Sequence, residues 1–171
     1  NLSCPRSRKV IRRRWARTTD PGGKVSPRFP AHGNHRFRWS GEVLCIEIFG
    51  VLNLEEVEVF FASLRQVVTE RGLTRWGRIV DLRHWEGITP DAKVAYAAIS
   101  DWYPTVGTVA HVQIYPSSFV QAMADAINRS VARVGPVRQC ASVEEGLEWL
   151  ETFGLKTGNV MAKDATQQST Q

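Results

Sequence analysis

Strand-like apolar runs and helix-start signals alternate along the middle of the chain, and this alternation restricts the fold more than any other sequence feature. Two strands come first, joined by the turn signal Ser40-Gly41, and each later strand is followed by a helix. The resulting order is β-β-α-β-α-β-α-β-α. A hairpin followed by helical crossovers predicts an α/β domain. Its mixed sheet should be largely parallel, with right-handed connections, about five strands and about four helices.

The clearest strand and helix follow each other in residues 42–72. Residues 42–49 alternate between strongly apolar and other side chains, as a half-buried strand does. Asn53 then begins a helix, because its side chain can cap the first turn and Glu56 three residues later completes a capping box. Gly72 ends the helix. Its apolar residues recur at helical spacing: Leu54, Val57, Phe60, Phe61, Leu64, Val67 and Val68.

Three more strands are predicted over residues 78–82, 109–115 and 137–140, and each precedes a helix. The second helix starts at Thr89-Pro90-Asp91, where a hydroxyl cap, a proline at the first helical position and an acid in the first turn coincide. It should end near Ser100 or Trp102.

The last two helices have similar start signals. Ser117 or Ser118 begins the third helix, whose apolar stripe reaches Val131. Ser142 and Glu145 form a second capping box at the start of the fourth helix, which a glycine at position 154 ends.

The two ends of the chain differ in composition from the middle. Residues 1–36 lack apolar periodicity and are expected to form a disordered basic arm, residues 37–155 the folded domain, and residues 156–171 a disordered polar tail. Residues 1–38 hold eleven of the 22 Lys and Arg but one of the 17 Asp and Glu, so the remainder of the chain is acidic. Nucleic-acid or anionic-surface binding is therefore expected only through the arm. An organellar presequence is another interpretation of the arm.

The composition also excludes several classes of protein. A hydrophobic content of 43% and a charged content of 23% are globular values, and no apolar run approaches the ~18–20 residues of a membrane span. Cys4, Cys45 and Cys140 form no metal-like pair, which predicts reduced thiols and a cytoplasmic protein. His84 and His111 have no carboxylate or thiol at metal spacing, so no metal is expected.

Catalytic motifs are missing from the sequence. There is no nucleophile elbow, glycine-rich phosphate loop, HExxH motif or pair of spaced carboxylates. Asp81 stands at a strand end, which is a common catalytic position, but an ion pair with Arg83 or Arg138 explains it as well. The chain is therefore not expected to be an enzyme or to hold a cofactor.

This pattern resembles the SpoIIAA-like proteins, which are related to STAS domains and to CRAL-TRIO-like lipid carriers. The resemblance covers roughly residues 37–155 and rests on four segments: Val43–Asn53, Ile79–Arg83, His111–Tyr115 and Ala141–Leu150. It implies a non-catalytic role in which the domain binds a partner protein or a small apolar ligand.

The chain departs from this resemblance at one position. STAS antagonists of anti-sigma factors carry an Asp-Ser-Ser-Gly type stretch after the corresponding strand, with a phosphorylated serine at the start of the next helix. The equivalent stretch here is Thr89-Pro90-Asp91-Ala92, so a proline or an aspartate holds the acceptor position. Thr89 is the nearby hydroxyl. It can be a helix cap or a phosphoacceptor, and the cap alone explains it.

Four aromatic residues are the remaining candidates for binding a ligand or partner. Trp85 lies in a predicted loop, residues 83–89, at the carboxyl end of a strand, where α/β domains place their ligand crevices. Packing of Trp85 over the next helix is the alternative. Tyr96, Trp102 and Tyr103 stand beside several small alanines, which predicts an apolar pocket between this segment and the sheet. Close helix–sheet packing explains the same alanines.

Three function classes follow from these observations. The first is a regulatory or ligand-binding domain that recognises a protein partner or a small ligand. The second is a carrier of a small apolar molecule, such as a lipid, and the third is a nucleic-acid or anionic-surface binder that works through the arm. The sequence leaves the oligomeric state open, and a weak homodimer is compatible with it.

Overall fold

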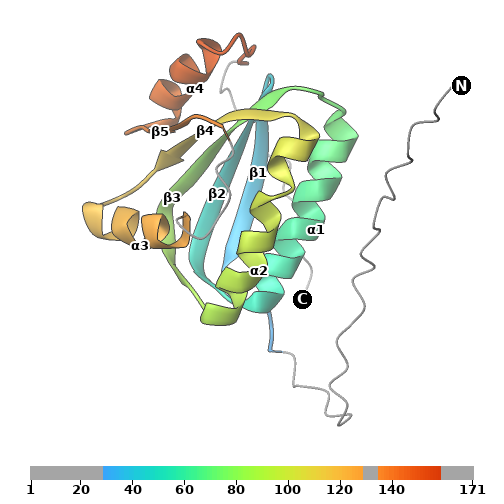
Figure 1. Ribbon diagram of the computed structural model, residues 1–171. Helices are drawn as coiled ribbons and strands as arrows, with labels where there is room; N and C mark the ends of the chain where they lie inside the picture. The colour runs from blue at the N-terminus through green and yellow to red at the C-terminus, as the bar shows by residue number, and fades with distance from the viewer. Residues whose placement is uncertain (1–28, 129–134, 159–171) are drawn as a thin grey trace, which may run out of the picture.

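The computed structural model describes residues 29–128 and 135–158, which form a five-stranded sheet with helices on both faces (Figure 1). The strands are β1 (Asn34–Ser40), β2 (Val43–Leu52), β3 (Trp76–Ile88), β4 (Thr108–Ile114) and β5 (Val137–Gln139). The helices are α1 (Leu54–Arg71), α2 (Pro90–Ser100), α3 (Ser118–Asn128) and α4 (Val143–Glu151), with a short 3-10 helix, η1 (Tyr103–Val106), after α2. The element order is the one that the sequence predicts, with η1 added. Within the described ranges no helix has the length and apolar character that crossing a membrane requires.

The strands lie in the sheet in the order in which they occur in the chain. β1 and β2 are antiparallel, and Ser40 pairs with Val43 across a tight turn. All later neighbours are parallel. Because the parallel strands are added in one direction and such crossovers are right-handed, α1, α2 and α3 are expected on the same face of the sheet. α4 follows β5 and covers the other face, as Figure 1 shows.

Two buried clusters confirm this arrangement. The first lies between the sheet and α1, α2 and α3, on what we call the α1–α3 face, and includes Leu44, Ile46, Phe60, Leu64, Trp76 and Val80. The second lies under α4, on the α4 face, and includes Val43, Cys45, Ile79, Val112, Leu147 and Leu150. Since both faces are covered, four consecutive β2 residues, 43–46, are all buried.

Paired strands and hydrogen bonds extend past both ends of the domain predicted over residues 37–155. β1 begins at Asn34, ahead of the expected start at residue 37. At the other end, the Lys156 carbonyl accepts a hydrogen bond of 2.7 Å from the Glu42 backbone N–H, and the Ser40 hydroxyl donates to the Gly158 carbonyl at 2.6 Å. Residues 1–28 and 159–171, which make up most of the predicted arm and tail, and the predicted helix end at 131 lie outside the described residues.

The predicted loop over residues 83–89 is wrong for most of its length, because β3 continues to Ile88. β2 is long enough to pair with this extension: Phe49 lies opposite His84, and Gly50 opposite Trp85. Register shifts on either side of this pairing, together with the positive φ of Gly50, interrupt the regular alternation that would have revealed the strand. The extension carries Trp85 onto the sheet.

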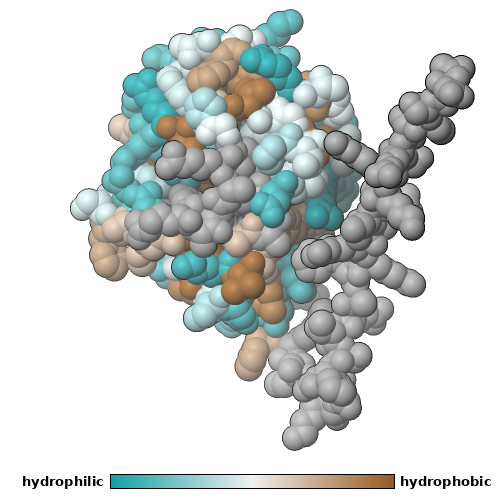
Figure 2. Space-filling model, in the orientation of Figure 1, coloured by the Kyte–Doolittle hydropathy of each residue, from teal (hydrophilic) through white to brown (hydrophobic). Residues whose placement is uncertain are grey.

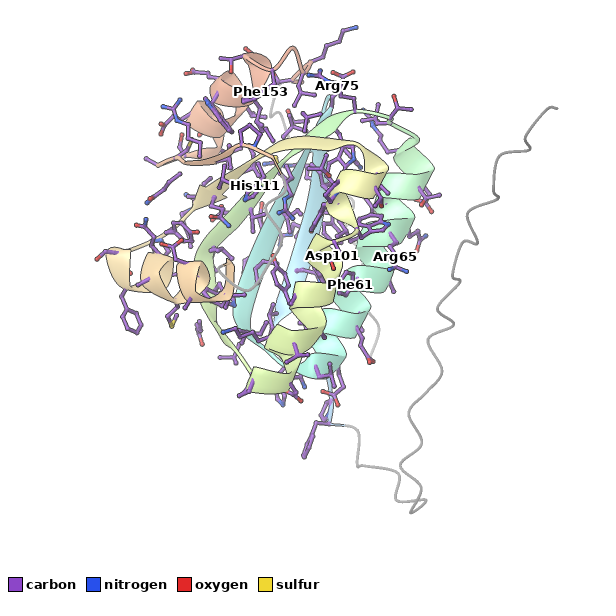
Figure 3. The ribbon with its side chains drawn as sticks, viewed as in Figure 1. Phe61, Arg65, Arg75, Asp101, His111 and Phe153 are labelled. Carbon is purple, nitrogen blue, oxygen red and sulfur yellow. The ribbon has the colours of Figure 1, made fainter. Side chains whose placement is uncertain are left out.

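α4 is also tied to the start of β3 by side-chain contacts. Figure 3 shows Arg75 and Phe153 beside each other at this end of the sheet, where the Arg75 Nη2 donates to the Phe153 carbonyl at 2.5 Å. Trp149 packs edge-on against Phe153.

Candidate functional site

Three of the predicted site residues line one cavity of about 50 Å³ on the α1–α3 face. Trp85 comes from β3, Tyr96 from α2 and Tyr103 from η1. The other walls are mainly apolar side chains of β2, β3, α1 and α3: Ile46, Leu52, Phe60, Val80, Ala124 and Ile127. A cavity therefore lies where the sequence predicts a pocket. Ligand binding in it stays a prediction.

The polar groups of the cavity are uncharged. The Tyr115 hydroxyl donates to Oε1 of Gln113 at 2.5 Å, and Gln113 lines the cavity with Tyr96 and Tyr103. Burial raises the pKa of Tyr103 to about 12 against the opposing effect of the nearby Arg78 charge. Its phenol is therefore protonated at neutral pH and can form a hydrogen bond but cannot serve as a general base. This chemistry suits binding of an apolar group.

Trp85 combines the two roles that the sequence left open. Its side chain is 6% exposed and belongs to the buried cluster under the helices, so it packs as a core residue. It also lines the cavity.

Trp102 and Thr89 do not line the cavity. Trp102 is half-buried beside Tyr103 and lies under the guanidinium of Arg65, whose Cζ is 5.9 Å from its ring centroid. Thr89 stands at the start of α2, and its carbonyl accepts the backbone N–H of Lys93 at 2.9 Å. The structure therefore brings three of the five predicted site residues together at the cavity and places the other two, Thr89 and Trp102, outside it.

The start of α2 is capped differently from the sequence prediction. The Thr89 hydroxyl donates to Oδ1 of Asp91 at 2.6 Å, and the same oxygen accepts the backbone N–H of Ala92 at 2.9 Å. The hydrogen bond from Thr89 and then that from Ala92 lower the pKa of Asp91. Asp91, rather than Thr89, thus supplies the side-chain acceptor for this helix end.

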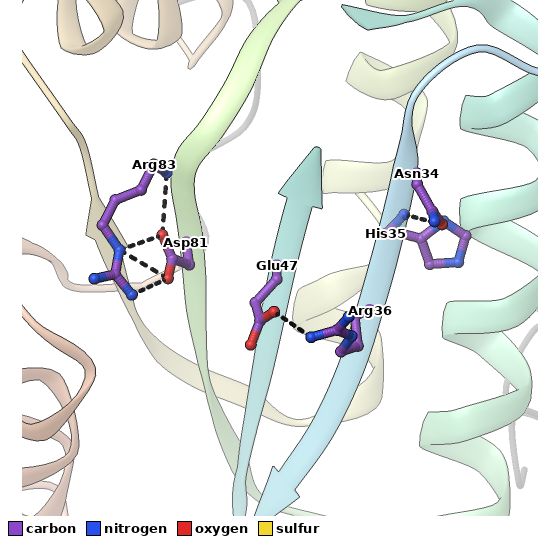
Figure 4. Close-up of polar contacts among 6 residues, drawn as sticks. All are labelled: Asn34, His35, Arg36, Glu47, Asp81 and Arg83. Carbon is purple, nitrogen blue, oxygen red and sulfur yellow. Dashed lines mark hydrogen bonds and ion pairs between the residues drawn. The ribbon is translucent and has the colours of Figure 1, made fainter. Parts of the chain in front are cut away.

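Asp81 forms an ion pair with Arg83, which is one of the two partners that the sequence suggests for it. Its carboxylate, 6% exposed, accepts hydrogen bonds from the Arg83 side chain at 3.0, 3.1 and 2.6 Å and from the Arg83 backbone N–H at 3.0 Å. Figure 4 shows this pair beside the Arg36–Glu47 pair of the neighbouring strands. Burial raises the pKa of Asp81, but the Arg83 hydrogen bonds and charge outweigh it and leave the pKa below its ordinary value. Such an aspartate is ionised and fully engaged.

We expect Asp81→Asn to lower the free energy of unfolding by about 1 kcal/mol at pH 7, because charged hydrogen bonds weaken and Arg83 is itself half-exposed. A folded-state pKa below the ordinary 3.8 stabilises the fold above that pH, and the contribution is lost as the pH falls through the folded pKa. Urea unfolding of both proteins between pH 7 and pH 2 tests this. A difference that persists unchanged at the acid end would contradict the ion-pair explanation.

Comparison with solved structures shows a shared fold. SpoIIAA, an anti-sigma factor antagonist solved in its unphosphorylated form, matches with a TM-score of 0.51 at 15% sequence identity, over 69% of this chain and 98% of that chain. An uncharacterized protein from Shewanella loihica with a SpoIIAA-like fold matches with a TM-score of 0.55 at 13% identity, over 74% of this chain and 99% of that chain. No protein-family model matches the chain, and no curated protein matches it either.

The chain has the SpoIIAA-like fold. The resemblance inferred from its strand and helix motifs is thereby confirmed at the level of the fold. In this SpoIIAA-like domain the extension of β3 to Ile88 places Thr89 directly after a paired strand, where its backbone N–H donates to the Leu52 carbonyl at 3.0 Å.

The burial of two polar residues of the SpoIIAA-like domain was not predicted from the sequence, where His111 was considered only as a metal ligand. Arg78 on β3 is 5% exposed, and His111, its register partner on β4, is 6% exposed. The available signal was their position in strands that are flanked by helices in the sequence. Helices on both faces of a sheet bury such side chains whichever way they point.

The described thiols of the SpoIIAA-like domain are buried and unpaired with each other. Cys45 and Cys140 are 3% and 4% exposed, as the sequence predicts. Burial raises the pKa of Cys45 to about 11, so its thiol is not a nucleophile at neutral pH. Across residues 29–128 and 135–158 no three His, Cys, Asp or Glu side chains gather in a way that could hold a metal ion.

Proposed function

We propose that this SpoIIAA-like domain is a non-catalytic regulatory module that acts by binding a protein partner. The observation that carries the proposal is the shared fold with SpoIIAA, which extends over 98% of that chain. SpoIIAA is an anti-sigma factor antagonist, so its role is directed at another protein. The fold supports the same class of role here.

The chemistry of the described residues supports this proposal. The carboxylate of Asp81 is held by Arg83, the Cys45 thiol is buried with a raised pKa, and the Tyr103 phenol is protonated. A general base or nucleophile needs a free, poised group within reach of a substrate. None of these three groups meets that requirement.

The helix layer on the α1–α3 face offers a surface for a partner. Val94 of α2 is 74% exposed and Phe119 of α3 is 71% exposed. Figure 2 shows hydrophobic residues over the region that α3 and the lower part of α2 occupy in Figure 1. Large apolar side chains in contact with water are typical of the cores of protein interfaces. We therefore assign the partner surface to α2 and α3.

Thr89 has a lesser part in this proposal. A phosphate on its hydroxyl would break the hydrogen bond to Asp91 and place two negative groups side by side. The capping arrangement therefore favours an unmodified Thr89. If mass spectrometry of natively purified protein finds a phosphate on Thr89, the regulation resembles that of the STAS antagonists after all.

A small ligand in the cavity is the second candidate function. The cavity that Trp85, Tyr96 and Tyr103 line favours it, since these walls are apolar and mostly buried. Its volume of about 50 Å³ is well below the roughly 300–1,000 Å³ of ordinary ligand pockets. A group of a few heavy atoms fits this space, whereas a lipid chain does not, so protein binding remains the better-supported function.

Cross-linking in cells, followed by purification of the chain, tests the proposal with two matched variants. Val94→Glu alters the assigned surface, and Val59→Glu introduces the same charge on α1, where Val59 is 48% exposed. We expect one partner to be recovered with the wild-type chain and with Val59→Glu, and to be lost with Val94→Glu. Equal recovery with both variants would contradict the assigned surface, and cross-links to nucleic acid in place of protein would support binding through the arm.

A further inference from the structure

Arg78 is a buried cation without a counter-charge among the described residues. It is 5% exposed in the middle of β3, and its Nε and Nη1 have no hydrogen-bond partner in the described structure. The arginines with a carboxylate partner in the described ranges are Arg36, Arg83 and Arg138. An arginine stays charged in a protein, and a buried charge that lacks a counter-ion and leaves two of its donor atoms unsatisfied is unfavourable.

Arg78 contacts Tyr103 through a side-chain hydrogen bond and through the aromatic ring, and these contacts leave Nε and Nη1 without a partner. Its Cζ lies 3.7 Å from the ring centroid of Tyr103, so the guanidinium stacks on the aromatic face. This cation–π contact is favourable, but a ring face does not satisfy the N–H groups that point along the guanidinium plane. The phenol of Tyr103 is protonated and supplies no negative charge.

The position of Arg78 connects it to the cavity. Tyr103 carries the guanidinium on its ring and also lines the cavity. Val80, two residues further along β3, and Gln113, its register partner on β4, are cavity residues as well. Arg78 and the neighbouring His111 therefore occupy the next row of the sheet beyond the cavity, on the α1–α3 face.

We propose that Arg78 anchors an internal binding site for a small oxyanion, either inorganic phosphate or a short carboxylate. A guanidinium donates several parallel N–H groups and matches the oxygens of carboxylate and phosphate better than any other side chain. Bound water would satisfy the donors but would leave the charge uncompensated. This site goes beyond partner binding and does not depend on the proposed function.

Thermal unfolding of the full chain tests the site with inorganic phosphate and acetate as probes, at an ionic strength held constant with sodium chloride. Arg78→Met removes the charge and keeps a chain of similar length. Arg65→Met is the matched control, because Arg65 is also stacked on aromatic rings but is exposed. We expect a saturable rise in Tm for the wild type and for Arg65→Met, and none for Arg78→Met.

The variant comparison also separates binding from a structural role. Without added oxyanion, Arg78→Met is expected to unfold at the same temperature as the wild type or higher, since it removes an uncompensated charge. A large loss of Tm in Arg78→Met, with no oxyanion effect on the wild type, would assign Arg78 to the core alone and overturn the proposal. Equal rises in Tm for the wild type and Arg78→Met on adding an oxyanion would show a general salt effect, which would also overturn the proposal.

A measurement on the wild type covers the case in which Arg78→Met fails to fold. The Nε–H resonance of Arg78 in the ¹⁵N-labelled full chain should move and saturate as one of the two probes is added. Saturation by phosphate but not acetate identifies a phosphate site, and the reverse identifies a carboxylate site. A resonance that stays in place with both probes contradicts the proposal.

Discussion

Trp76→Ala is expected to lower the free energy of unfolding by about 4 kcal/mol, in the range of large-to-small substitutions of buried tryptophans. Trp76 is fully buried at the start of β3, and its indole Nε1 donates to the Val106 carbonyl at 2.7 Å. Its ring also packs on Trp39 and Tyr103, with centroids 5.7 and 6.2 Å apart. Alanine removes all three contacts, leaves a cavity and deprives the Val106 carbonyl of its donor.

Urea unfolding followed by far-UV circular dichroism measures this loss without relying on tryptophan fluorescence. Trp102→Ala is the matched control, because Trp102 is half-buried at the edge of the same aromatic group. We expect Trp102→Ala to lower the free energy of unfolding by less than half as much as Trp76→Ala, since it removes less buried apolar area. An equal loss of unfolding free energy in the two variants would show that Trp76 is not the centre of the core on the α1–α3 face.

His35→Ala is expected to lower the free energy of unfolding by about 3 kcal/mol, because it leaves the carboxylate of the buried Glu56 without its partner. The His35 Nδ1 lies 2.7 Å from the Glu56 carboxylate, and the two side chains are 11% and 7% exposed. The imidazole also packs against Phe37 and Phe60, with ring centroids 4.9 and 5.2 Å away. The substitution therefore removes packing as well as the polar contact.

The exposed His32 provides the control for this prediction. His32 contributes its backbone N–H to Asn53 at 2.9 Å, which alanine retains, so His32→Ala should change the free energy of unfolding by less than about 0.5 kcal/mol. The double variant His35→Leu with Glu56→Met should recover much of the loss, because two apolar residues can replace a buried polar pair. A His35→Ala protein as stable as the wild type would mean that the pair does not form.

Local signals in the sequence were sufficient for most of the fold. Asn53 caps α1 as predicted, accepting the Glu56 N–H at 3.0 Å, and Ser142 caps α4 by accepting the Glu145 N–H at 3.2 Å. Each cap involves residues close in the chain, so the pattern of a few residues determines it. The order of strands and helices, and with it the SpoIIAA-like fold, follows from such signals.

The features that the sequence did not reveal depend on contacts between distant segments. Residues 83–88 become a strand because the end of β2 pairs with them. Arg78 is buried because η1 places Tyr103 over it, and η1 itself has no strong sequence signature. For the same reason Trp85, Tyr96 and Tyr103 meet at one cavity while Trp102 and Thr89 do not. Residue type predicted these aromatics as candidates, but their grouping required the packed helix layer.

The affinity of the captured protein partner for purified variants tests most directly whether this domain acts through its α2 and α3 surface. Isothermal titration with the wild type, Val94→Glu and Val59→Glu separates the assigned surface on α2 and α3 from the neighbouring helix α1. We predict a loss of about tenfold or more in affinity for Val94→Glu, as expected when a charge enters an interface core, and no change beyond about twofold for Val59→Glu. An unchanged affinity of Val94→Glu, with both variants folded, would contradict it.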